Sequence, residues 1–152
     1  MSKEIERKYL VTNNGYESMA ISSTRICQGY LSADPDATVR VRIGGNHAYI
    51  TVKSRNHGAV RNEWEYEIPV GDAEDMIARC HIVCLEKTRY IVQFGKHIWE
   101  VDRFHGGLSG LVIAEIELSD AHETFSLPPF VGQEVTSNPE YFNSSLIKRL
   151  NH

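Results

Sequence analysis

The sequence predicts a mainly β fold of the α+β class, in which eight antiparallel strands close into a barrel with a few covering helices. Turn signals recur at short intervals, at residues 13–15, 34–36, 44–46, 56–58, 94–96 and 106–107, and segments rich in Val, Ile, Tyr and Thr separate them. Such spacing favours an antiparallel meander over parallel βαβ units. About eight strands with short turns can close around side chains or one small ligand.

The predicted elements follow from these turns. The strand candidates are residues 3–12, 25–32, 38–43, 48–55, 61–70, 85–94, 97–103 and 111–119. A helix is predicted over residues 71–79, because Asp72 is a candidate N-cap and acidic residues occupy the first turn. A final helix is predicted from residue 138 to about residue 150, with Asn138 as its cap and Pro139 at its first position.

Length and charge restrict the class of protein. The 152 residues suit one domain, 1–152, and a net charge of -4 argues against general nucleic-acid binding. No run of about 18 apolar residues occurs, and the first residues are polar, so neither a membrane span nor a secretory signal is expected. The three cysteines form no framework pattern, which suggests reduced thiols and a cytoplasmic location.

The ionisable residues of each candidate strand fall on one face, because side chains on a strand alternate between its two faces. The rows are Glu4, Glu6 and Lys8; Arg40 and Arg42; Thr51 and Lys53; Arg61, Glu63, Glu65 and Glu67; Lys87 and Arg89; Glu100 and Asp102; and Glu115 and Glu117. The simplest interpretation of such rows is the solvated face of a half-buried antiparallel sheet.

Three features favour an enclosed lumen over a solvated face. First, the signs are segregated by strand, as in the basic pair Arg40 and Arg42 and the acidic pair Glu115 and Glu117, whereas a solubilising surface mixes them. Second, arginine offers a planar fork for phosphate oxygens. Third, paired carboxylates suit Mg²⁺ and Mn²⁺. Such a lumen needs a polyanion and metal ions to neutralise it, and the apolar outer faces need helices or a dimer partner over them.

The charged rows also match a known family in order. The matching segments are Glu4-Ile5-Glu6-Arg7-Lys8, Gln28-Gly29-Tyr30-Leu31, Arg40-Val41-Arg42, Thr51-Val52-Lys53, Arg61-x-Glu63-x-Glu65, Glu86-Lys87-Thr88-Arg89-Tyr90, Glu100-Val101-Asp102, Glu115-Ile116-Glu117, Gly132-x-Glu134-Val135-Thr136 and Tyr141-x-Asn143-x-x-Leu146. From residue 3 to about residue 147, the chain resembles the CYTH superfamily, the triphosphate tunnel metalloenzymes, and in particular its short bacterial inorganic tripolyphosphatases.

The resemblance implies an eight-stranded tunnel that binds a linear triphosphate with two divalent ions, Mg²⁺ or Mn²⁺. The phosphate contacts it implies are Lys8, Arg40, Arg42, Lys53, Arg61, Lys87 and Arg89, and the metal ligands are Glu4, Glu6, Asp102, Glu115 and Glu117. Lys8, Lys87 and Arg89 are also expected to take part in catalysis, and Glu63 and Glu65 to support metal-bound water or the basic rows. The final helix, with Tyr141 and Asn143, would plug one end of the tunnel, and Tyr30 would pack against it.

The predicted function is therefore metal-dependent hydrolysis of a linear triphosphate by two-metal activation of water. Inorganic tripolyphosphate is the first choice, because nothing outside the ionic rows builds a pocket for a base or a thiazolium group. Thiamine triphosphatase and class IV adenylate cyclase activities on the same fold are alternatives. A non-enzymatic polyphosphate or nucleotide sensor is a further one, although anion capture alone would need only the basic rows. No nucleic-acid or membrane partner is expected, and a homodimer is compatible with the apolar outer faces.

Overall fold

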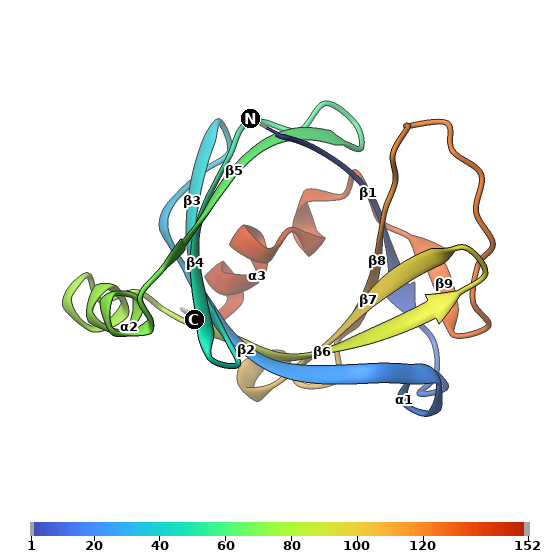
Figure 1. Ribbon diagram of the computed structural model, residues 1–152, viewed down its shortest axis with the longest axis horizontal. Helices are drawn as coiled ribbons and strands as arrows, with labels where there is room; N and C mark the ends of the chain where they lie inside the picture. The colour runs from blue at the N-terminus through green and yellow to red at the C-terminus, as the bar shows by residue number, and fades with distance from the viewer. Residues whose placement is uncertain (1, 151–152) are drawn as a thin grey trace.

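Eight antiparallel strands form a closed barrel in the computed structural model, which describes residues 2–150 (Figure 1). The strands are β1 (Ser2–Val11), β2 (Ala20–Asp34), β3 (Ala37–Gly44), β4 (His47–Lys53), β5 (Val60–Ile68), β6 (Leu85–Phe94), β7 (His97–Phe104) and β8 (Val112–Glu117). A short ninth strand, β9 (Val131–Glu134), pairs with the end of β1. The predicted eight-stranded barrel is thus confirmed.

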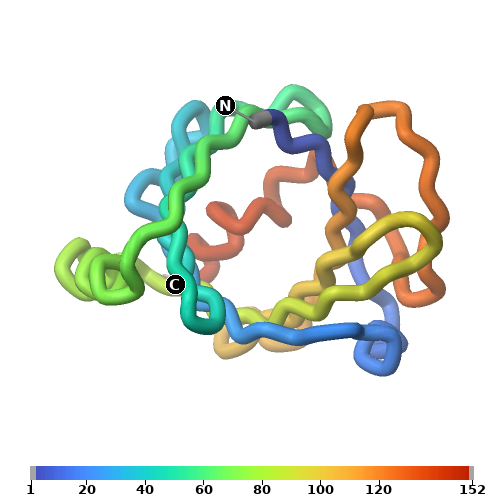
Figure 2. The backbone as a smooth tube through the Cα atoms, in the orientation of Figure 1, coloured from blue at the N-terminus to red at the C-terminus, as the bar shows by residue number. Residues whose placement is uncertain are grey.

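Closure of the barrel depends on the two ends of the strand order. The sheet runs β5-β4-β3-β2-β6-β7-β8-β1, and β1 then pairs with β5. In that pairing Glu4 lies opposite Arg61 and Ile5 opposite Val60, while residues 6–10 of β1 pair with β8. The backbone trace in Figure 2 shows the resulting ring, with the C-terminal segment lying within its outline. Each of the eight strands therefore has a partner on both sides.

Most strand boundaries differ from the prediction by one or two residues, and two larger differences occur at β2 and β9. Strand β2 begins at Ala20 rather than at residue 25, because its polar first part pairs with β6 through Ser22 and Ile91. The residues 20–24 are mostly small and polar, so their strand signal is weak and only the pairing partner holds them extended. Strand β9 was not predicted at all, since four residues give too short a pattern.

The helices also depart from the prediction in detail. Helix α2 (Val70–Arg79) follows Pro69, so Asp72 lies within the first turn and is not the N-cap. The predicted helix 138–150 is split into a 3-10 turn (Pro139–Tyr141) and α3 (Asn143–Leu150), because Phe142 between them is extended. The cap itself was predicted correctly, since the Asn138 side chain accepts a hydrogen bond from the Glu140 N–H. A short helix α1 (Tyr16–Met19) was not predicted.

Two of the three buried apolar clusters lie outside the barrel wall, and the one under α3 lies on its inner face, because Leu85 and Phe104 share strand faces with Lys87 and Asp102. Trp99, Ile116 and Phe130 belong to one buried cluster, Leu85, Phe104 and Leu146 to a second under α3, and Val41, Ala48 and Ala73 to a third under α2. The outer face of β5 is less well covered, and Tyr66 there is 64% exposed. No helix within residues 2–150 is long and apolar enough to cross a membrane.

Candidate functional site

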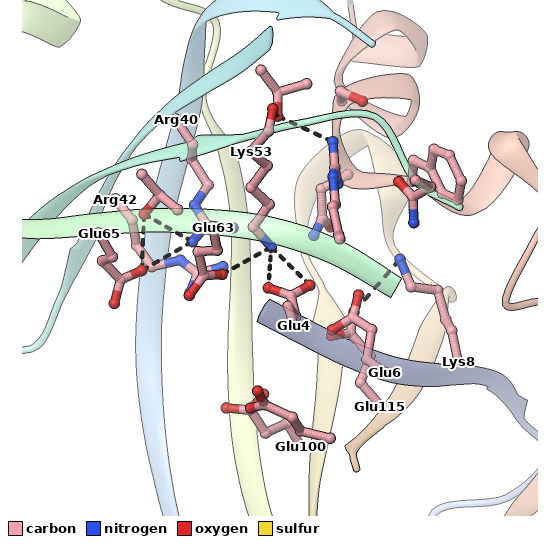
Figure 3. Close-up of a pocket in the computed structure, with 18 of the residues that line it drawn as sticks. Glu4, Glu6, Lys8, Arg40, Arg42, Lys53, Glu63, Glu65, Glu100 and Glu115 are labelled. Atoms are coloured by element: carbon pink, nitrogen blue, oxygen red, sulfur yellow. Dashed lines mark hydrogen bonds and ion pairs between the residues drawn. The ribbon is translucent and has the colours of Figure 1, made fainter. Parts of the chain in front are cut away.

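The inward-facing side chains of the barrel enclose a cavity of about 180 Å³, which is almost entirely polar (Figure 3). Its charged lining consists of six cations, Lys8, Arg40, Arg42, Lys53, Arg61 and Arg89, and seven carboxylates, Glu4, Glu6, Glu63, Glu65, Glu100, Glu115 and Glu117. Because neither sign dominates, the site is suited to an anion bound together with cations rather than to either alone.

Most of the lumen cations are held by carboxylates from neighbouring strands. The Lys53 ammonium lies 2.7 Å from Glu4 and 3.5 Å from Glu63, while Lys8 lies 3.6 Å from Glu115. These contacts follow from the register, which places Lys53 opposite Glu63 and Lys8 opposite Glu115. The charged rows of separate strands therefore lie side by side on the wall of one lumen.

Arg42 and Arg61 are held instead by neutral acceptors. Among residues 2–150, no carboxylate oxygen lies within 4.0 Å of either guanidinium. The Arg42 Nε donates to the Gln28 side-chain oxygen at 2.7 Å, and Arg61 donates to the Ser54 carbonyl at 2.7 Å and to the Thr38 hydroxyl at 3.1 Å. Burial, together with the nearby charges of Arg40 and Arg89, lowers the pKa of Arg42 to about 9. An anion in the lumen would relieve this repulsion.

Arg89, which lines the cavity, belongs to a buried triad with Lys87 and Asp102, which do not line it. Lys87, which is 0% exposed, has its ammonium 2.6 Å from Asp102, and Asp102 also accepts from Arg89 at 2.8 and 2.9 Å. Burial lowers the pKa of Lys87 to about 7, although the Asp102 charge opposes this effect. Burial would raise the pKa of Asp102, but the charges of Arg89 and Lys87 hold it well below its usual range. Of the predicted site residues, Lys87 and Asp102 therefore do not reach the cavity surface.

The carboxylates of β1, β7 and β8 gather on one side of the lumen. Burial first, and then the charges of Glu115 and Glu4, raise the pKa of Glu6 well above its ordinary value. Burial and the charges of Glu4 and Glu100 likewise raise the pKa of Glu117. Such mutual repulsion indicates excess negative charge, which a bound cation would neutralise.

A divalent hard metal fits this donor set, since all the groups are carboxylate oxygens. Within the described part of the chain, no three Asp, Glu, His or Cys side chains already converge as a metal cage. This is compatible with Mg²⁺, which usually keeps several waters and binds one or two carboxylates together with phosphate oxygens of a substrate. The acidic side of the lumen therefore supplies ligands for a metal that substrate oxygens would complete.

Two carboxyl groups at the β1–β5 seam, Glu4 and Glu63, lie against the same Lys53 ammonium. The hydrogen bond from Glu63 to Glu4, followed by burial, raises the pKa of Glu63 to about 7. Burial alone would raise the pKa of Glu4, but the same hydrogen bond and the Lys53 charge lower it to about 2. Glu63 thus titrates near neutral pH in the metal-free protein.

The α3 end of the lumen is lined by the C-terminal segment. Phe142, Asn143 and Ser144 line the cavity, and the Lys8 ammonium donates to the Tyr141 carbonyl oxygen at 3.2 Å. The Tyr141 ring does not line the cavity but packs with Tyr30 against the buried cluster under α3. The predicted plug helix is therefore confirmed, and its contact with Lys8 runs through a backbone carbonyl that no side-chain pattern could reveal.

Some lining residues were not among the predicted site residues. They are Glu100, Thr38, Thr51, Asn56, Thr136, Phe142 and Ser144. The strand period gave a usable signal for Glu100, which shares a face with Asp102, and for Thr51, which shares one with Lys53. Asn56 and Thr136 lie outside the strands, where period-two alternation makes no prediction.

A closed antiparallel barrel with both signs of charge inside places the chain among β-barrel proteins with a charged lumen, and comparison with known sequences identifies the family. The model of the CYTH domain family matches residues 2–150, so the chain belongs to the CYTH family.

Three relatives show how close the similarity is. The chain is 46% identical over 149 residues to an inorganic triphosphatase of Acetivibrio thermocellus, covering 97% of this chain and 95% of that protein. It is 35% identical over 147 residues to an inorganic triphosphatase of Nitrosomonas europaea, covering 94% and 95%. The crystal structure of an inorganic triphosphatase matches with a TM-score of 0.67 at 33% identity, covering 97% of this chain and 95% of that one.

Proposed function

We propose that this protein hydrolyses linear triphosphates, with inorganic tripolyphosphate as its substrate, in a reaction that depends on divalent metal ions. The observation that carries the proposal is the cavity itself, in which six cations and seven carboxylates from separate strands line one enclosed lumen. The inorganic triphosphatases that are 46% and 35% identical to the chain support the same activity.

The inorganic substrate is favoured by what the cavity lacks. Among its lining residues in the described chain, the aromatic ones are Tyr30 and Phe142. Phe142 precedes α3, and Tyr30 packs against the cluster under that helix, so both lie toward the end that the C-terminal segment lines. Elsewhere the lining is polar or charged, and it offers no stacking surface for a nucleobase or a thiazolium ring.

The cations bind the substrate in this proposal. Arg42 and Arg61 have no carboxylate partner among the described residues, so their charge is free for phosphate oxygens. Arg40, Lys8, Lys53 and Arg89 would exchange part of their contacts with carboxylates for contacts with phosphate when metal ions neutralise those carboxylates. Lys87 does not line the cavity and acts indirectly, by holding Asp102 together with Arg89.

The acidic side would hold two ions, Mg²⁺ or Mn²⁺, through Glu4, Glu6, Glu115 and Glu117, with Asp102 joining if Lys87 and Arg89 release it. A bound divalent ion lowers the pKa of a bound water, so that hydroxide becomes available at neutral pH. The protein's own residues align the phosphate chain for in-line attack and offset the charge on the leaving phosphate, the latter through the guanidinium and ammonium groups. Glu63 and Glu65 keep Lys53 and Arg40 in place.

The test is a matrix of phosphate release from tripolyphosphate, ATP and thiamine triphosphate, each with Mg²⁺ and Mn²⁺. We expect release from tripolyphosphate to exceed release from ATP by more than tenfold, and EDTA to abolish it. Formation of cyclic AMP from ATP would instead indicate a cyclase, and preferred cleavage of thiamine triphosphate would change the substrate. If tripolyphosphate raises the melting temperature but no phosphate appears with either metal, the protein is a sensor and the proposal fails.

A separate variant tests the proposal that Glu117 is a metal ligand. Glu117→Gln removes one negative oxygen from the acidic side, and we expect at least a hundredfold loss of turnover while tripolyphosphate binding stays measurable by calorimetry. Glu74→Gln is the matched control, because Glu74 is exposed on α2 outside the barrel. Equal turnover in Glu117→Gln and Glu74→Gln would remove Glu117 from the metal site.

A further inference from the structure

The lumen contains one neutral side chain whose position is difficult to explain by packing alone. Gln28 lies on the inner face of β2 and is 0% exposed. Its register partners are Arg42 on β3 and Leu85 on β6, so it lies directly beside the guanidinium-bearing row. Its side-chain oxygen accepts the Arg42 Nε–H at 2.7 Å, and its side-chain nitrogen has no partner.

Leaving an amide nitrogen buried without a partner costs free energy, so packing alone does not favour an amide at this position. Of the two polar atoms of the Gln28 side chain, only the oxygen makes a hydrogen bond. That oxygen fixes the Nε edge of Arg42, which leaves the two terminal NH₂ groups of the guanidinium directed elsewhere.

The neutrality of this acceptor distinguishes Arg42 from most of its neighbours. Lys8, Lys53, Arg40 and Arg89 each have a carboxylate within 4.0 Å, and a carboxylate at position 28 would do the same for Arg42. An amide holds the guanidinium without neutralising it. Arg42 is thereby both oriented and left with its full charge, close to Arg40 and Arg89.

We propose that Gln28 is a positioning residue that orients Arg42 while keeping its charge available to a phosphate group of the substrate. The inference rests on the proposed function only in taking a linear triphosphate as the ligand. Gln28 does not itself line the cavity, so it acts through Arg42 and makes no contact with phosphate.

The two halves of the proposal are separated by two substitutions. Gln28→Met removes the acceptor but keeps the length of the side chain, so Arg42 loses its orientation. Gln28→Glu keeps an acceptor but adds a charge that neutralises Arg42. We expect tripolyphosphate affinity to fall about tenfold in Gln28→Met, and further in Gln28→Glu. A residue that only fills space would leave Gln28→Met within twofold of the unmodified protein, so the size of the Gln28→Met effect separates the two roles.

A double-mutant cycle assigns the effect to Arg42. In an Arg42→Ala background, Gln28→Met should change affinity by less than twofold, because the group it orients is gone. In an Arg61→Ala background the two effects should multiply, since Arg61 is held by Ser54 and Thr38 and not by Gln28. Gln133→Met is the matched control for the chemical change, because Gln133 is exposed on β9.

Affinity is measured by calorimetry with tripolyphosphate in EDTA, and KM and kcat are measured separately with metal. Three results would support the inference. Affinity decreases from the unmodified protein to Gln28→Met and again to Gln28→Glu, and the effect of Gln28→Met depends on Arg42. KM rises while kcat changes by less than threefold. Affinity within twofold for Gln28→Met, equal effects with and without Arg42, or no metal-free binding by the unmodified protein would each overturn the inference. If the unmodified protein binds but releases no phosphate, the proposed hydrolysis fails while the role of Gln28 is still decided by affinity.

Discussion

Replacing Lys87 by methionine should stabilise the metal-free protein at pH 6. Lys87 is fully buried, and its ammonium lies 2.6 Å from Asp102. Methionine matches the lysine side chain in length and carries no charge. Asp102 would not be left unpaired, because Arg89 continues to donate to both of its oxygens at 2.8 and 2.9 Å. The substitution therefore removes a buried cation without leaving a buried anion uncompensated.

The size of the stability gain and its pH dependence follow from the pKa of Lys87, which burial lowers from 10.5 to about 7. In the unfolded chain lysine keeps a pKa near 10.4, so the unfolded state binds more protons between pH 7 and pH 10. The penalty for the buried ammonium is therefore complete below pH 7 and is relieved as the pH rises toward 10. At about 1.4 kcal/mol per pKa unit the shift corresponds to about 5 kcal/mol, and relaxation and water penetration reduce the expected gain to about 1–4 kcal/mol.

The assay is urea unfolding in EDTA at pH 6 and pH 9. Lys87→Met should unfold at higher urea than the unmodified protein at pH 6, with a melting temperature higher by about 2–4 °C per kcal/mol, and its advantage should shrink at pH 9. Lys96→Met is the control, because Lys96 is exposed in the β6–β7 turn. A destabilised Lys87→Met, or a gain equal at both pH values, would show that the buried lysine stabilises the fold and would refute the reasoning.

Three further predictions concern other parts of the fold. Gly29→Ala should cost about 1–3 kcal/mol in urea unfolding, since a Cβ there would lie 2.8 Å from the Val83 carbonyl oxygen, and an unchanged midpoint would contradict this contact. Leu146→Ala should cost about 2–4 kcal/mol by leaving a cavity under α3, and a smaller loss would mean that the helix is not firmly packed. Glu63 has its pKa raised to about 7, so its ionisation lowers the stability of the metal-free protein as the pH rises from about 4.5 through 7. Glu63→Gln should flatten that decline of the melting temperature between pH 5 and 8. An unchanged dependence of the melting temperature on pH would exclude the raised pKa of Glu63.

Period-two alternation was sufficient to predict which charged residues of each strand share a face. It placed Glu4, Glu6 and Lys8 on one face and Arg40 and Arg42 on another, and these residues do line the cavity. The alternation is a local property of an extended backbone, so the sequence alone carries it. Where the local signal was weak, as in residues 20–24 and in β9, the prediction missed the strand because only a distant partner holds it extended.

The pairing of the charges was decided by the tertiary structure. Nothing in the sequence shows that Lys87 is paired with Asp102, that Glu4 and Glu63 both contact Lys53, or that Gln28 holds Arg42. The contact of Glu4 depends on closure between β1 and β5, while the other contacts join neighbouring strands and depend on their register. The sequence by itself determined which side chains of each strand share a face. Only the closed barrel decided which of them touch, because strand register is set by pairing across the whole ring and not by the pattern within one strand.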